Sequence, residues 1–181
     1  MKKYITLLII LIAVAVVIFG SVYAYDKITN ENNLTASSFA VKSSSGLAQD
    51  FTVYNYDRKE FSLAQMQGKA TVVNFWASWC PPCVGELPHF NSLYNYYKDS
   101  VNFMMVNTED ASQMDNVAAF ISDNGYSFPV YYDLDYSGTK AYSINAIPVT
   151  LFIDKDGNLI EKQVGAMDEE TIREYIEEIL K

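Results

Sequence analysis

The chain has 181 residues, enough for one domain and an appendage, and half of them are apolar. Its formal net charge of −9 argues against a nucleic acid partner, because binding to phosphates requires patches of lysine and arginine. The two cysteines are too few for a small secreted fold that is held together by several disulfides.

Residues 4–25 form an uncharged, mostly apolar run that follows Lys2 and Lys3. As a helix with a rise of about 1.5 Å per residue, this run would cross a hydrocarbon core of about 30 Å. Residues 1–25 are therefore predicted to be a transmembrane signal anchor, and the two lysines place the N-terminus in the cytoplasm. A cleaved signal peptide is the alternative, in which case the protein would be secreted. Both interpretations place the rest of the chain outside the cytoplasmic membrane.

Residues 26–50 are rich in Asn, Ser and Thr and contain few large apolar side chains, which predicts a flexible linker. Residues 51–181 are predicted to form the folded domain. Within it, apolar runs between turn residues predict strands at 51–54, 60–63, 71–76, 101–106 and 128–132, and a final hairpin of 149–153 and 159–164.

Helices are expected between these strands. Apolar residues at helical spacing predict a helix over residues 82–97, in which Pro88 should cause a kink or a break. Ser112 is expected to cap a second helix that ends at Gly125, residues 137–142 form a short third helix, and Asp168 caps the last one. This order of elements predicts an α/β sheet with helices on both sides.

Both cysteines lie in one motif, Trp79-Cys80-Pro81-Pro82-Cys83, between a predicted strand and a predicted helix. A thiolate at the start of a helix is stabilised by unpaired backbone N–H groups and by the helix dipole. Such a pair can exchange with a disulfide, with Cys80 as the nucleophile and Cys83 as the thiol that resolves the mixed disulfide. A zinc site would need four ligands, and the chain has no second cysteine pair and a single histidine, so neither metal nor cofactor is expected.

The two residues between the cysteines bear on the direction of exchange. Pro81 and Pro82 have no backbone N–H, and neither carries a positive charge. The loop therefore offers the Cys80 thiolate few donors, and a less stabilised thiolate makes the pair a better reductant. The sequence thus predicts a reducing protein, with a disulfide-forming oxidant as the alternative.

The order of the elements resembles the thioredoxin fold throughout residues 51–181. Residues 73–83 resemble the active-site segment of thioredoxins, and residues 146–150 resemble their cis-proline loop. The pattern Trp-Cys-x-x-Cys-x-x-Glu-x-Pro from Trp79 to Pro88, with an extra helix and strand over 112–132, is more similar to the membrane-tethered ResA/TlpA type. The resemblance implies a thioredoxin fold with an inserted helix–strand unit, preceded by one N-terminal transmembrane helix.

The resemblance also assigns roles to residues outside the cysteine pair. Glu86 lies one helical turn beyond Cys83, where a buried carboxyl with a raised pKa could relay a proton between the thiols. An exposed glutamate in the first turn of the helix is the alternative. Thioredoxins carry a buried aspartate where this chain has Asn74, which leaves Glu86 as the remaining candidate.

The same resemblance predicts a cis peptide bond before Pro148, which would expose the backbone of Ile147 to an incoming substrate strand. An ordinary trans proline at the start of a strand is the alternative. Trp79, Pro81 and Pro82 are expected to contact the substrate beside Ile147 and Pro148.

Taken together, these features predict an extracytoplasmic thiol–disulfide oxidoreductase that reduces disulfides in exported proteins, with apocytochrome c as one candidate. The resemblance implies a membrane thiol transporter as electron donor, and the domain is expected to be a monomer that binds no nucleic acid. The alternative from another functional class is a tethered binding module without enzymatic activity.

Overall fold

The structure is a computed structural model, and it describes residues 46–181. The predicted anchor of residues 1–25 and most of the predicted linker of residues 26–50 lie outside this range. Among residues 46–181, no helix is both long enough and apolar enough to span a membrane. Gly46 and Leu47, which the sequence places in the linker, form a short strand instead. Both residues are exposed, so backbone hydrogen bonds to β8 (Asn158–Val164) hold this strand in place. The side chains of such a strand show no apolar pattern from which it could be predicted.

The described residues contain a mixed sheet with the strand order β1-β8-β7-β4-β5-β6-β2-β3. Its central strands β4 and β5 are parallel, β6 continues this parallel arrangement, and the other neighbours are antiparallel. The strands are β1 (Gly46–Leu47), β2 (Thr52–Tyr54), β3 (Glu60–Ser62), β4 (Ala70–Trp76), β5 (Val101–Asn107), β6 (Val130–Tyr132), β7 (Val149–Ile153) and β8 (Asn158–Val164).

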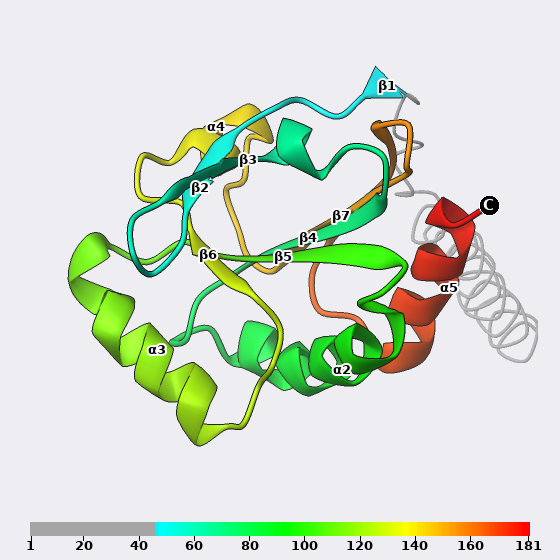
Figure 1. Ribbon diagram of the computed structural model, residues 1–181. Helices are drawn as coiled ribbons and strands as arrows, with labels where there is room; N and C mark the ends of the chain where they lie inside the picture. The colour runs from blue at the N-terminus through cyan, green and yellow to red at the C-terminus, as the bar shows by residue number, and fades with distance from the viewer. Residues whose placement is uncertain (1–45) are drawn as a thin grey trace, which may run out of the picture. The chain divides into compact units, whose positions relative to one another are not determined.

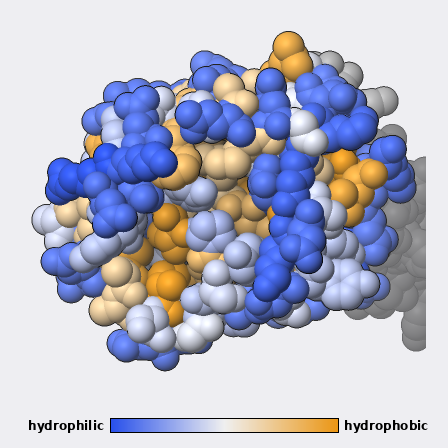
Figure 2. All heavy atoms as spheres, viewed as in Figure 1, coloured by the Kyte–Doolittle hydropathy of each residue, from blue (hydrophilic) through white to orange (hydrophobic). Residues whose placement is uncertain are grey.

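Helices cover both faces of the sheet, as predicted (Figure 1). One buried cluster joins one face of the sheet to α2, α3 and α5, and a second joins the other face to β2 and the segment around α4. The α-helices are α2 (Pro81–Tyr97), α3 (Met114–Asp123), α4 (Ser137–Ala141) and α5 (Glu169–Ile179), and short 3₁₀ turns lie at η1 (Leu63–Met66) and η2 (Ala111–Gln113). On the face shown in Figure 2 the residues are mostly hydrophilic, with apolar residues visible in its middle.

The helix α2 runs unbroken for 17 residues through Pro88, so the predicted break is absent. A proline inside a helix removes one backbone hydrogen bond. Leu87, Phe90 and Leu93 are fully buried on the inner face of α2, and their packing against the sheet outweighs that loss.

The predicted cap of the second helix is wrong. Ser112 lies inside η2, and α3 begins two residues later with Gln113 as its N-cap and no capping hydrogen bond from a side chain. Asp115, three residues after Ser112, accepts a hydrogen bond from the hydroxyl of Tyr56 at 2.7 Å. The end of α3 is as predicted, because Gly125 follows it with a φ of +67°.

The cap of the last helix is confirmed. The Asp168 side chain accepts a hydrogen bond from the backbone N–H of Thr171 at 2.9 Å, and α5 begins at Glu169. The buried side chains of Ile172, Ile176 and Ile179 lie on the inner face of this helix.

Candidate active site

The cysteine pair lies where β4 ends and α2 begins. Cys80 is the N-cap of α2, and Cys83 is its third residue. The two residues are joined by a disulfide, with their Cα atoms 5.3 Å apart. Cys83 is fully buried and Cys80 is 4% exposed, so the first cysteine is the more accessible of the two. The roles of Cys80 as nucleophile and Cys83 as resolving thiol stay predictions.

The first turn of α2 is poor in hydrogen-bond donors. Pro81 and Pro82 occupy its first two positions, N1 and N2, and Cys83 occupies N3. An N-cap side chain normally accepts a hydrogen bond from the N–H of N2 or N3. Because Pro82 has no N–H, the N–H of Cys83 is the remaining capping donor for a Cys80 thiolate.

A second loop faces Cys80 from the start of β7. The peptide bond between Ile147 and Pro148 is cis, as the sequence predicts. The carbonyl oxygen of Ile147 lies 3.8 Å from Cys80 Sγ. The carbonyl oxygen of Pro148 accepts a hydrogen bond from the N–H of Gly165 at 2.9 Å, which fixes the loop to the end of β8.

An open groove of about 540 Å³ lies beside Cys80. Four of the predicted substrate-contacting residues line it, namely Trp79, Pro81, Pro82 and Ile147, whereas Pro148 is buried and does not line it. The groove is also lined by Thr108, Tyr136, Thr139 and Ile144. The indole of Trp79 is 69% exposed, which leaves a large apolar surface available to a ligand.

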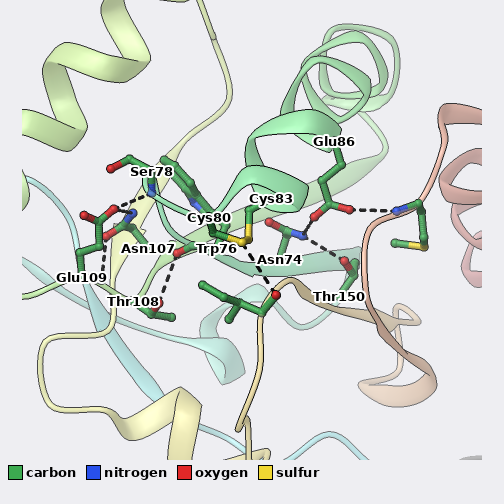
Figure 3. Close-up of a disulfide and its surroundings, with 12 residues drawn as sticks. Asn74, Trp76, Ser78, Cys80, Cys83, Glu86, Asn107, Thr108, Glu109 and Thr150 are labelled. Carbon is green, nitrogen blue, oxygen red and sulfur yellow. Dashed lines mark hydrogen bonds between the residues drawn. A yellow bond between two sulfur atoms is a disulfide. The ribbon is translucent and has the colours of Figure 1, made fainter.

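Glu86 is 1% exposed, so the alternative of a solvated glutamate is wrong. One carboxylate oxygen accepts a hydrogen bond from Asn74 Nδ2 at 2.8 Å, and the other accepts one from the N–H of Met167 at 3.1 Å (Figure 3). Burial raises the pKa of Glu86 from an ordinary 4.5 to about 7, although the two hydrogen bonds partly oppose this effect. The predicted burial and raised pKa are therefore both confirmed.

Successive side chains of β4 point to opposite faces of the sheet, which explains why Asn74 contacts Glu86. Val73 and Phe75 contribute to the cluster on the α4 side of the sheet, whereas Asn74 reaches Glu86 on α2. Asn74 also donates a hydrogen bond to Thr150 Oγ1 at 3.0 Å, and Thr150 is its direct partner in the β4–β7 register.

Sequence reasoning missed several polar residues around the site. Thr150 and the backbone N–H of Met167 belong to the Glu86 network, Asn107 is the last residue of the neighbouring strand β5, and Glu109 follows that strand. All four are brought in by sheet pairing or by a distant loop, and no local motif marks them. Among residues 46–181, no three His, Cys, Asp or Glu side chains are placed to hold a metal ion.

The arrangement is suited to the reversible oxidation of a cysteine pair. Together with a central sheet of this order and a cis-proline loop, it is typical of the thioredoxin-like thiol–disulfide oxidoreductases. The model of the Redoxin family matches residues 42–179, and the chain belongs to this family as a ResA-type thiol–disulfide oxidoreductase.

Curated relatives support this placement. The chain is 34% identical over 133 residues to the thiol-disulfide oxidoreductase ResA of Geobacillus thermodenitrificans, covering 73% of this chain and 75% of that one. It is 31% identical over 131 residues to ResA of Halalkalibacterium halodurans, covering 72% and 73% of the two chains.

Solved structures are similar as well. StoA from Bacillus subtilis matches with a TM-score of 0.60 and 30% identity, over 71% of this chain and 97% of that one. The exposed lipoprotein thioredoxin of Streptococcus pneumoniae matches with a TM-score of 0.62 and 25% identity, over 72% of this chain and 99% of that one.

Proposed function

We propose that this oxidoreductase works as a reductant of exported proteins on the extracytoplasmic side of the membrane. The observation that carries the direction is Pro82 at N2 of α2, where it removes a backbone N–H that the N-cap side chain could accept. A Cys80 thiolate that receives fewer hydrogen bonds is less stable, and the reduced form of the couple is then less stable as well. A couple whose reduced form is less stable gives up its electrons more readily.

The exchange proceeds in two steps. The Cys80 thiolate attacks one sulfur of the substrate disulfide, a Cys80–substrate disulfide forms, and the second substrate sulfur leaves as a thiolate. The Cys83 thiolate then attacks Cys80 Sγ, which releases the first substrate sulfur and closes the Cys80–Cys83 disulfide. Two electrons pass to the substrate, and the proton of the Cys83 thiol is taken up by Glu86.

Glu86 is suited to that role by its position and its pKa. It lies one helical turn beyond Cys83 on the inner face of α2, away from solvent. With a pKa of about 7, the carboxyl exchanges a proton at neutral pH without a large free-energy penalty in either direction.

The groove beside Cys80 is the proposed substrate site. An extended segment of the substrate would pair with the backbone of Ile147, whose carbonyl oxygen faces Cys80 Sγ. Trp79, Pro81 and Pro82 would contact the residues that flank the substrate disulfide. An unfolded exported protein fits this mode, and apocytochrome c is one candidate.

The N-terminal part of the chain supplies the proposed location. Residues 1–25 would act as a membrane anchor, and the linker would join it to the domain outside the cell membrane. The similarity to a pneumococcal exposed lipoprotein thioredoxin supports a location of the domain on the extracytoplasmic side of the membrane. A monomeric domain would receive electrons from a membrane thiol transporter.

Two single substitutions test the direction of exchange. Pro82→Ala restores an N–H at N2, where the N-cap side chain can accept it, so the reduction potential of the couple should rise. A hydrogen bond to a charged group contributes about 1.5–3 kcal/mol, which corresponds to about 30–60 mV for a two-electron couple. Pro81→Ala is the matched control, because the N–H of N1 is not one that an N-cap side chain normally accepts. Equal potentials for Pro82→Ala and the parent protein would contradict the proposal.

A further inference from the structure

The loop that carries the nucleophile is tied to the neighbouring strand β5. Trp76 at the end of β4 is paired in register with Asn107 at the end of β5, so the two strands end side by side. The N–H of Thr108 donates a hydrogen bond to the carbonyl oxygen of Trp76 at 3.0 Å. The residues that follow β5 therefore lie against the loop that leads to Cys80.

One side chain of this segment holds the loop directly. Glu109 Oε1 accepts a hydrogen bond from the backbone N–H of Ser78 at 2.6 Å, two residues before Cys80 (Figure 3). A short hydrogen bond between a carboxylate and a backbone N–H is among the stronger kinds in proteins. Ser78 and Glu109 are both half-buried, so solvent competes only partly for this contact.

Glu109 is itself held in place by Asn107. Asn107 Nδ2 donates to the same carboxylate oxygen at 3.1 Å, and Asn107 Oδ1 accepts from the N–H of Glu109 at 2.9 Å. Asn107 is fully buried. The buried amide of Asn107 thus orients Glu109, and Glu109 orients the loop before Cys80. Within this loop, the N–H of Cys80 also donates a hydrogen bond to the carbonyl oxygen of Ala77 at 3.2 Å.

We propose that Glu109 is a positioning residue for the nucleophile. Its hydrogen bond to Ser78 keeps Cys80 Sγ against the carbonyl oxygen of Ile147, where a bound substrate strand would present its disulfide. The inference concerns thiol–disulfide exchange itself and holds for either direction of electron flow, so its failure would leave the proposed reductive function untouched.

Three variants of the full chain test this role. Glu109→Ala removes the acceptor of the Ser78 hydrogen bond, and Glu109→Gln keeps an acceptor oxygen without the charge. Glu161→Ala is the control, because Glu161 is also a half-buried glutamate but lies on β8. The assay compares reduction of insulin, whose disulfides must align in the groove, with reduction of a small aryl disulfide that needs no alignment. Dithiothreitol supplies the electrons in both cases.

We expect Glu109→Ala to lower kcat for insulin about tenfold and to change the rate with the small disulfide less than about twofold, because misplacement affects only the aligned reaction. Glu109→Gln should recover most of the loss, and Glu161→Ala should match the parent protein. An unchanged kcat in Glu109→Ala would overturn the proposal, as would equal losses with both substrates or a Glu109→Gln variant no faster than Glu109→Ala.

If Glu109→Ala fails to fold, the amide resonance of Ser78 gives an independent measurement in Glu109→Gln. The proton of an amide that donates to a carboxylate resonates downfield, and a neutral acceptor should move it upfield. A Ser78 resonance that is the same in Glu109→Gln and the parent protein would overturn the proposal.

Discussion

Replacing Glu86 by Gln should change how the stability of the protein depends on pH. Burial raises the pKa of Glu86 from 4.5 to about 7 in the folded protein, whereas the unfolded chain keeps the ordinary value. The folded state therefore binds the proton more tightly than the unfolded state does. Its contribution to stability is fully present below pH 4.5 and is lost as the pH rises through 7.

The size of the effect follows from the two pKa values. A difference of one pKa unit corresponds to about 1.36 kcal/mol, so ionisation of Glu86 should lower the free energy of unfolding by about 3 kcal/mol between pH 4 and pH 8. The glutamine introduced by Glu86→Gln is a neutral side chain of the same shape that stays uncharged throughout. In this variant that part of the pH dependence should disappear.

Urea unfolding followed by tryptophan fluorescence measures this directly, with the Cys80–Cys83 disulfide intact in both proteins. All other groups titrate alike in the two proteins, so the difference between their free energies of unfolding isolates Glu86. We expect this difference to grow by about 3 kcal/mol in favour of the variant from pH 4 to pH 8. A difference that is constant over this range would show that burial does not raise the pKa of Glu86 in the folded protein.

Other substitutions test separate parts of the structure. Cys80→Ser should abolish exchange, whereas Cys83→Ser should accumulate the mixed disulfide with substrate, which mass spectrometry detects; rapid turnover by Cys80→Ser would contradict the assignment of the nucleophile. Gly138→Ala should lower the free energy of unfolding by about 1–3 kcal/mol, because the added Cβ would lie 2.7 Å from a ring carbon of Phe75. Asp168→Ala should cost about 1 kcal/mol in urea unfolding through loss of the α5 cap, with no effect on the exchange rate of the folded protein.

Local patterns predicted the parts of the fold that local chemistry decides. The apolar runs gave the central strands within one or two residues, since β4 and β5 are buried along nearly their whole length. Asp168 and Gly125 mark helix ends because capping and a positive φ depend on the residue itself. The cysteine pair, the cis bond before Pro148 and the burial of Glu86 followed from a motif with a known structural context.

Predictions failed where distant residues decide the local structure. Ser112 does not cap α3, because it lies inside η2 and α3 begins only at Met114; Asp115 is bound to Tyr56 from another part of the chain. Of the kink or break expected at Pro88, the break does not occur, because buried side chains hold α2 on both sides of it. The Glu109–Ser78 hydrogen bond depends on the register between β4 and β5, which no run of residues in the sequence encodes locally.

The reduction potential of the Cys80–Cys83 couple decides whether the protein is a reductant or an oxidant of exported proteins. It can be measured by equilibrating the protein with glutathione or dithiothreitol buffers and trapping the free thiols. We expect a value near or below about −250 mV, in the range of thioredoxin, which suits a donor of electrons to exported proteins. A value near about −120 mV would mark an oxidant and would contradict the effect assigned to Pro82.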